Sequence, residues 1–221
     1  MRFSRSPQWV VRDLGRADYA EVNALQERLI ARIAAGEEPD HLLLAEFEPV
    51  ITIGRGGGGA SQYAHLGVPI HEISRGGKAT FHGPGQLVAY PLLRLEDEAR
   101  DLHAYLHALE DALIGVMSDF GLAGGRDPRN TGCWVKGRKV ASIGVAVRRW
   151  VTWHGLALNV TTDLDWFRRF DPCGLDPDVM TTMAAECAAA GRPEPGRDEV
   201  RAAVTNRILH VLRGSEGEDP A

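Results

Sequence analysis

The spacing of apolar residues predicts three long helices in this chain. Between residues 18 and 35 they recur every three or four positions, which places on one face Val22, Leu25, Leu29 and Ile33. Asp18 and Glu21 have the spacing of a capping box that starts a helix, and Gly36 suits the turn that ends one. The same periodicity predicts helices at residues 101–120 and 200–212, with shorter helices at 166–170 and 179–189.

Short apolar runs rich in β-branched residues predict strands between these helices. They lie at residues 41–47, 50–53, 68–73, 87–93 and 151–160. The stretch 134–147 predicts a hairpin that turns at Lys136 and Gly137, and the stretch 75–87 is predicted to be a loop. Hairpins mixed with helices are typical of an α+β fold, here a mixed, largely antiparallel sheet flanked by helices.

Length and composition favour one folded domain. The chain has 221 residues, of which 44% are hydrophobic, and we expect a single domain over residues 1–213 followed by a disordered acidic tail at 214–221. It has no apolar run long enough to predict a membrane span and no apolar core of a secretory signal near its start. Three cysteines without metal-ligand spacing indicate reduced thiols in a cytoplasmic protein.

The charge distribution bears on possible partners. A net charge of −5 argues against a nucleic-acid-binding protein. One segment, residues 126–149, has the opposite sign, because it holds seven arginines and lysines and the single acid Asp127, a sum of +6. Such a segment is either the solvated rim of a hairpin or a docking surface for an acidic partner, and the sequence leaves both interpretations open.

Two glycine-rich stretches are candidates for ligand loops. Residues 54–59 have GxGxxG spacing, but no helix pattern opens at the third glycine, so a surface loop is predicted and not a dinucleotide site. Residues 75–87, RGGKATFHGPGQL, carry four glycines, which let a backbone approach a bound group without Cβ atoms in the way. No phosphate loop is present, and His103 and His107 are predicted to be helix-surface residues, so we expect no cofactor and no metal.

Cys173 and Lys139 are candidates for covalent chemistry. Cys173 stands in the turn-like sequence DPCGL, but its neighbouring aspartates disfavour a thiolate, so a reactive thiol needs a cation from elsewhere. Strict alternation puts Lys139 on the strand face of Ala141, Ile143, Val145 and Val147, and the lysine points into the interior if that face is packed. The alternatives are a structural cysteine and a strand-end lysine that reaches solvent.

These motifs occur together in one family. The patterns RGG--T-HGPGQL, TG-W----KVASIG, HGLALNV and PCG, in this order over residues 14–183, resemble the lipoyl(octanoyl) transferases of the biotin/lipoate protein ligase-like fold. The resemblance implies that Cys173 carries an acyl thioester and that Lys139 is paired with it. It also implies an acyl-binding site formed by Arg75, Gly76, Gly77, Lys78, Ala79, Thr80, Phe81, His82, Ser142, Ile143, Gly144, Gly155, Leu156 and Ala157.

The activity that the resemblance implies needs no cofactor. An octanoyl or lipoyl group would pass from acyl carrier protein, through the cysteine thioester, to a lysine of a lipoyl domain. The implied acceptors are the lipoyl domains of 2-oxoacid dehydrogenase complexes and the glycine cleavage H protein. An ATP-dependent lipoate–protein ligase of the same fold and a non-catalytic acyl-binding module are the alternatives.

The site of such an enzyme must stabilise a developing oxyanion. Amides of the glycine-rich loop, together with His82, are candidates to face the thioester carbonyl. The chain departs from the family pattern at Phe81, where tyrosine is frequent, at Phe47, where histidine is usual, and in the MTTM sequence at residues 180–183.

Overall fold

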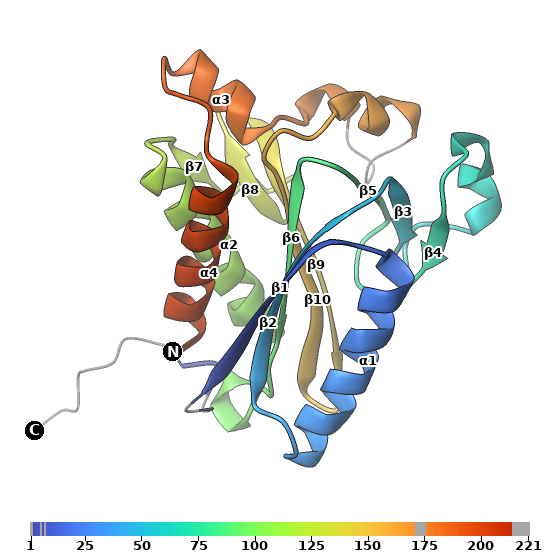
Figure 1. Cartoon of the computed structure of the whole chain (residues 1–221), viewed down its shortest axis with the longest axis vertical. Coiled ribbons are helices and arrows are strands. Elements are labelled where there is room, and N and C mark those ends of the chain that lie inside the picture. The colour runs from blue at the N-terminus through green and yellow to red at the C-terminus, as the bar shows by residue number, and fades with distance from the viewer. Residues whose placement is uncertain (1, 5, 7, 171–175, 214–221) are drawn as a thin grey trace, which may run out of the picture.

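A seven-stranded sheet forms the centre of the computed structural model, which describes residues 2–4, 6, 8–170 and 176–213 (Figure 1). In spatial order its strands are β1 (Trp9–Ala17), β2 (Asp40–Phe47), β6 (Gln86–Leu92), β10 (Val151–Asn159), β9 (Arg138–Arg148), β8 (Gly132–Val135) and β7 (Gly124–Gly125). β1 and β2 pair in parallel and the other neighbours pair antiparallel. The predicted mixed, largely antiparallel sheet flanked by helices is confirmed.

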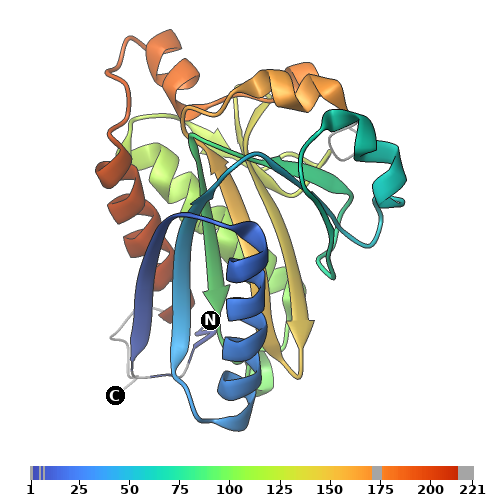
Figure 2. The same cartoon turned by 45° about the vertical axis from the view of Figure 1, so that its right-hand side comes forward.

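Helices cover both faces of this sheet. α1 (Tyr19–Ala35) lies on one face, and α2 (Leu102–Asp119) and α4 (Arg197–Arg213) lie side by side on the other (Figures 1 and 2). Leu42 and Leu44 of β2 join the core beneath α2 and α4, whereas Leu43 and Ala45 join the core beneath α1. Because both faces of the central strands are buried, these strands are apolar without alternation.

Local signals set the helix ends as predicted. The carboxylate of Asp18 accepts a hydrogen bond from the backbone N–H of Glu21 at 3.0 Å, and Gly36 ends α1 with a φ of 77° in the left-handed region. Asp101 caps α2 in the same way. The predicted short helices become the 3-10 helices η3 (Leu164–Arg169) and η4 (Pro177–Val179) and the α-helix α3 (Met183–Ala189).

A second, three-stranded sheet corrects the loop prediction for residues 75–87. It has the order β4 (Ile70–Glu72), β3 (Val50–Ile53) and β5 (Ala79–His82), so β5 lies inside that stretch. Ala79 and Phe81 of β5 enter a third hydrophobic cluster together with Ile51 and Phe167. The strand was missed because four residues between two pairs of glycines resemble a turn more than a strand.

Several further elements, β7 among them, were not predicted. β1 is an edge strand in which Arg12, Asp13 and Arg16 interrupt the apolar pattern, as charges do where a sheet edge must not pair with another chain. The 3-10 helix η1 (Ala60–Leu66) directly follows the glycine-rich residues 54–59. Another element, η2 (Asp97–Ala99), is a single turn before α2.

The hairpin of β8 and β9 has the predicted turn. Lys136 and Gly137 have φ values of 50° and 74°, as the two central residues of a type I′ turn require. In the described parts of the chain, no helix combines the length and apolar character that crossing a membrane requires. Cys173 and the predicted acidic tail at 214–221 lie outside the described residues, and the single-domain boundary at residue 213 stays a prediction.

Candidate active site

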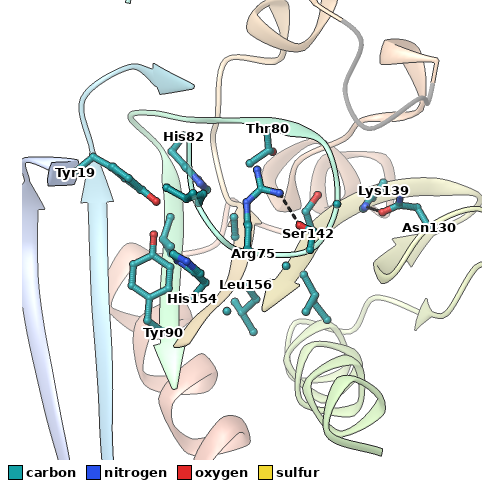
Figure 3. A pocket seen from close by; sticks show the side chains of 18 residues that line it. Tyr19, Arg75, Thr80, His82, Tyr90, Asn130, Lys139, Ser142, His154 and Leu156 are labelled. Carbon is teal, nitrogen blue, oxygen red and sulfur yellow. Dashed lines mark hydrogen bonds between the residues drawn. The ribbon is translucent and has the colours of Figure 1, made fainter. Parts of the chain in front are cut away.

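A pocket that is partly open to solvent lies between the central sheet and the segment that leads into β5 (Figure 3). Its floor comes from β6, β9 and β10, and its cover comes from the segment that begins at Arg75. Of the predicted site residues, those that line it are Arg75, Gly76, Gly77, Thr80, His82, Lys139, Ser142, Ile143, Gly144, Gly155, Leu156 and Ala157. Three segments far apart in the sequence therefore form one site.

Three predicted binding residues do not line this pocket. Ala79 and Phe81 alternate with Thr80 and His82 along β5, so they face the third hydrophobic cluster. The Phe81 ring stacks on Trp166 with centroids 4.9 Å apart. Lys78 is exposed beside the pocket.

The two glycine pairs of residues 75–87 have different tasks. Gly77 has a φ of 80°, and the N–H of Gly76 donates to Val145 O at 3.0 Å, which fixes the cover to β9. By contrast, Gly85 has a φ of 79° and lies against Thr161, and a Cβ on Gly83 would overlap the Phe81 ring. The second pair therefore serves packing outside the pocket, and only the first brings bare backbone to it.

Lys139 reaches the pocket through a bulge in β9. The lysine is buried, with 1% of its surface exposed, so of the two interpretations the interior lysine holds and not the strand-end lysine that reaches solvent. The predicted face is wrong, because Cys133 pairs with Ala141 and Trp134 pairs with Lys139, so the pairing skips Val140. Ala141 therefore faces the core beneath α2, while Lys139 faces the pocket.

The Lys139 ammonium donates to the side-chain oxygen of Asn130 (Figure 3). Asn130 is itself held by the indole N–H of Trp134, which donates to its backbone oxygen at 3.0 Å. Lys139 also lies over the Trp134 ring, 5.8 Å from its centroid. Asn130, a neutral acceptor, therefore helps to hold the amine in one place.

A chain of buried hydrogen bonds joins the cover of the pocket to the strand that carries Lys139. A guanidinium nitrogen of Arg75 donates to Thr52 Oγ1 at 3.0 Å, and Thr52 Oγ1 lies 3.4 Å from His82 Nε2. His82 Nδ1 lies 2.7 Å from Gln86 Oε1. The Gln86 amide then donates to Asn159 Oδ1 at 2.9 Å.

The last two bonds of the chain end at Lys139. The Asn159 amide donates to Thr181 O at 3.2 Å, and Thr181 N donates to Lys139 O at 2.9 Å. Because Thr181 O can only accept, Asn159 must donate to it through its side-chain nitrogen, and its side-chain oxygen then accepts from the nitrogen of Gln86. The side-chain oxygen of Gln86 must therefore accept the proton of His82 Nδ1. His82 is then neutral, with Nε2 as an acceptor toward Thr52.

This tautomer argues against the predicted contact between His82 and the thioester carbonyl. An acceptor nitrogen cannot stabilise an oxyanion, and both ring nitrogens of His82 already have partners. Burial lowers the pKa of His82 to about 4, which also favours the neutral ring. His82 therefore positions Thr52 and Gln86, and the N–H of Gly76 is not free for an oxyanion either, because it donates to Val145 O.

Several pocket residues were missed from the sequence. Asn130 directly precedes the TG-W motif, and His154 is the first residue of the HGLALNV motif, so one lay next to a quoted pattern and the other within one. Tyr19 and Tyr90 carry no such signal, because each occupies an ordinary buried position of a helix or strand. Burial lowers the pKa of His154 to about 3, so its ring is neutral as well.

The remaining cysteines are poor nucleophiles. Cys133 and Cys187 are both buried in the core beneath α2 and α4. Burial raises the pKa of the Cys133 thiol to about 11 and also raises that of Cys187. Neither thiol is available as a thiolate near neutral pH.

The basic segment 126–149 is not one patch. Arg126 pairs with Glu110 at 2.8 Å, and Arg138 pairs with Glu186 at 2.6 Å, so part of its charge is compensated internally. Arg148 stands nine positions after Lys139 in β9, which is about 30 Å of extended strand. The segment therefore contributes charge at two opposite ends of the sheet.

This architecture is that of the lipoate and biotin protein ligases. Lipoate-protein ligase A bound with ATP superposes with a TM-score of 0.68 at 14% identity, over 96% of this chain and 86% of that one. A biotin protein ligase from Leishmania major in complex with biotinyl-5-AMP gives a TM-score of 0.55 at 12% identity, over 93% and 75% of the two chains. At such identities the similarity shows the fold alone.

Sequence similarity then defines the family. Residues 18–209 match the model of the lipoyl protein ligase A/B catalytic domain, and the chain belongs to this family. It is 49% identical over 203 residues to a protein named Octanoyltransferase from Geobacter metallireducens, covering 92% of this chain and 93% of that one. An Octanoyltransferase from Solibacter usitatus is 48% identical over 192 residues, covering 84% and 87%. The predicted family and the predicted acyltransferase class are confirmed.

Proposed function

We propose that this protein transfers an octanoyl group from acyl carrier protein to a lysine of a lipoyl domain, through a thioester on Cys173. The observation that carries the proposal is Lys139, a buried cation on the wall of a largely apolar pocket that is open to solvent. The names of the relatives, Octanoyltransferase, support the acyl group that is moved.

Apolar groups and bare backbone form part of the pocket lining, as an acyl chain requires. Val88, Leu156 and Ala157 supply hydrocarbon surface, and Gly144 and Gly155 supply backbone without side chains. In Figure 3, Leu156 lies between the Lys139 side and the opposite side of the pocket. The chain would lie along this floor with its reactive carbonyl near Lys139.

The residues on either side of 171–175 support Cys173 as the nucleophile. Phe170 packs into the hydrophobic cluster that includes Phe81, next to the cover of the pocket. Met180 forms a bridge with Lys139. The described residues Phe170 and Met180, on the two sides of this segment, therefore both lie beside the pocket wall, which supports the proposed role of Cys173.

The reaction would take two balanced steps. The Cys173 thiolate attacks the octanoyl carbonyl, the carrier thiol leaves as a thiolate, and this thiolate takes up a proton. The acceptor amine then attacks the enzyme thioester, the C–S bond breaks, and the amine loses one proton while the amide forms. As an ammonium, Lys139 would stabilise the Cys173 thiolate and give a proton to the departing carrier thiolate in the first step. As a neutral amine, it would take up the proton released in the second step, which restores the starting state.

The proposed partners are octanoyl-acyl carrier protein as donor and lipoyl domains as acceptors. The acceptors include those of 2-oxoacid dehydrogenase complexes and the glycine cleavage H protein. A cytoplasmic location belongs to the proposal, since a catalytic thiol must stay reduced. No nucleotide is needed, because a thioester already carries the activation that an ATP-dependent ligase must supply.

Intact mass spectrometry after mixing the protein with octanoyl-acyl carrier protein, without ATP, tests the proposal. We expect a stoichiometric octanoyl adduct on Cys173 that disappears when a lipoyl domain is added. Cys173→Ser should lose the adduct, and the matched control Cys187→Ser should retain it. Acylation that requires free octanoate and ATP would identify a ligase, and tight binding without an adduct would identify a non-catalytic acyl-binding module.

A further inference from the structure

Asn130 lies beside Lys139 in the pocket wall, where none of the sequence motifs assigned it a role. Its side-chain oxygen Oδ1 accepts a hydrogen bond from the Lys139 ammonium (Figure 3). Because an ammonium can only donate, this bond fixes the orientation of the amide and leaves the nitrogen Nδ2 at its other end. Nδ2 donates to no residue that the structure describes, so its N–H groups can bind a group in the pocket.

The backbone of Asn130 is held by hydrogen bonds that do not involve its side chain. The Trp134 indole donates to Asn130 O at 3.0 Å, and Asn130 N donates to Asp127 O at 3.3 Å. Two positions later, Gly132 begins β8. A substitution at residue 130 therefore removes the side-chain amide and leaves the backbone contacts of the pocket wall in place.

Asn130 Nδ2 is close to the expected position of the reacting carbonyl. The oxygen and nitrogen of one amide are about 2.3 Å apart, so a hydrogen bond of about 2.9 Å to Oδ1 places Nδ2 within about 5 Å of the Lys139 ammonium. A Cys173 thiolate that this ammonium stabilises lies within about 4–6 Å of it, and a carbonyl about to be attacked lies about 3–3.5 Å from the thiolate. The attacked carbonyl and Asn130 Nδ2 are thus neighbours of the same ammonium.

The groups considered so far as donors to this carbonyl are engaged elsewhere or exposed. The N–H of Gly76 donates to β9, and both ring nitrogens of His82 have partners. Gly77 is exposed, so a donor there competes with water. Side-chain amides of asparagine serve as oxyanion donors in acyl-transfer enzymes. Asn130 offers such an amide at the Lys139 end of the pocket.

We propose that Asn130 Nδ2 donates a hydrogen bond to the oxyanion that forms when the thioester is attacked, which makes Asn130 a catalytic residue. This inference rests on the proposed acyl transfer through Cys173. As the thiolate sulfur bonds to the carbonyl carbon, an electron pair moves to the carbonyl oxygen, and it returns when the bond to the carrier sulfur breaks. The same oxygen becomes negative again when the acceptor amine attacks the enzyme thioester. Asn130 stabilises this charge in both steps and transfers no proton.

The test compares two reactions of the Cys173 thiol at one pH. The octanoyl thioester of N-acetylcysteamine, a small donor without a carrier protein, acylates the thiol through an oxyanion. Iodoacetamide alkylates it by displacing iodide from a saturated carbon, so no oxyanion forms. Intact mass gives both second-order rate constants, and their ratio cancels any change in the fraction of thiolate. Asn130→Leu should lower the ratio of acylation to alkylation at least about tenfold, since loss of one oxyanion donor costs on the order of 100- to 1000-fold in rate.

Asn130→Asp separates a donor from a residue that only positions Lys139. Its carboxylate still accepts a hydrogen bond from the ammonium, but it offers no N–H and repels an oxyanion, so the ratio should fall at least as far as in Asn130→Leu. A purely positioning role predicts the wild-type ratio for Asn130→Asp. If Asn130→Leu does not fold, Asn130→Asp decides alone. The matched control is Asn206→Leu, the same substitution at an exposed position of α4, which should keep the wild-type ratio.

A wild-type ratio in both Asn130 variants would overturn the inference, and a lower ratio in Thr80→Val or Ser142→Ala would then identify a pocket hydroxyl as the donor. A wild-type ratio in Asn130→Asp alone would also overturn it, because Asn130 would then act only by holding Lys139. In each of these cases octanoyl transfer itself would stand. A wild-type protein that forms no octanoyl adduct would instead overturn the proposed function, and the role of Asn130 with it.

Discussion

Replacing Gly132 by alanine should disrupt the strand that presents Lys139. Gly132 has a φ of 146°, a conformation that residues with a Cβ rarely adopt. A Cβ built there would lie 2.1 Å from Ala141 O and 3.0 Å from Lys139 Cε. The backbone of β9 would have to move, because a carbonyl oxygen cannot rotate away as a flexible side chain can.

The magnitude follows from two costs. Backbone strain at such a position is on the order of 1–3 kcal/mol. Overpacking against β9 adds about 1–3 kcal/mol. Gly132→Ala should therefore lower the free energy of unfolding by about 2–6 kcal/mol, a large fraction of the stability of a typical domain. For a chain of this size the melting temperature should fall by on the order of 10 °C.

Thermal and urea unfolding of Gly132→Ala measure this effect, and Gly125→Ala is the matched control. Gly125 lies in the neighbouring strand of the same edge hairpin, and a Cβ there would meet nothing within 4 Å. The control should change stability by less than about 1 kcal/mol. Equal stability of the two variants would refute the geometry derived for Lys139. Folded Gly132→Ala should also acylate more slowly, since Lys139 moves with β9.

Three further results are expected. Lys139→Ala should shift the pH profile of Cys173 alkylation by iodoacetamide upward by about 1–3 pH units, whereas superimposable profiles would remove Lys139 from thiol activation. Burial lowers the pKa of His154 to about 3 in the folded state, whereas its pKa in the unfolded state is near 6.5. The contribution of the neutral His154 ring to stability is therefore complete above pH 6.5 and is lost as pH falls toward 3. In urea titrations at several pH values, His154→Asn should flatten this decline in the free energy of unfolding. An unchanged dependence on pH would show that His154 is not the group responsible. Lys136→Glu should raise the apparent Michaelis constant for an acidic carrier protein more than Arg148→Glu does, because Arg148 is about 30 Å from Lys139 along β9. A larger effect of Arg148→Glu would place carrier docking at the hairpin that joins β9 and β10.

The parts of the fold that the sequence predicted correctly are those in which local signals act alone. α1 has a capping aspartate, a regular apolar face and a terminal glycine, and each was visible within a few residues. The turn at Lys136 and Gly137 likewise follows from a short pattern. By contrast, β5 depends on pairing with β3, a contact between segments about 30 positions apart, and its own composition indicates a turn.

The residues of the candidate site were likewise predicted only where a local motif marks them. The resemblance identified most of the residues that line the pocket, because motifs mark them. It did not give the strand face of Lys139, since one bulge residue, Val140, reverses the alternation on which that prediction depended. Nor could it give Tyr19 and Tyr90, whose hydroxyls meet at the pocket only after a helix and a strand pack together.

The departures from regular β-structure around the pocket bring polar side chains to its two ends. Gly132 and the bulge at Val140 bring Lys139 to one end of it, and the left-handed backbone of His154 brings an imidazole to the other. Regular alternation would have left Lys139 facing the core beneath α2. The residues of β9 and β10 between these positions pair without interruption and form the apolar floor. The irregular backbone positions of β8, β9 and β10 that shape the pocket thus lie at its two ends, and the regular sheet between them holds both in place.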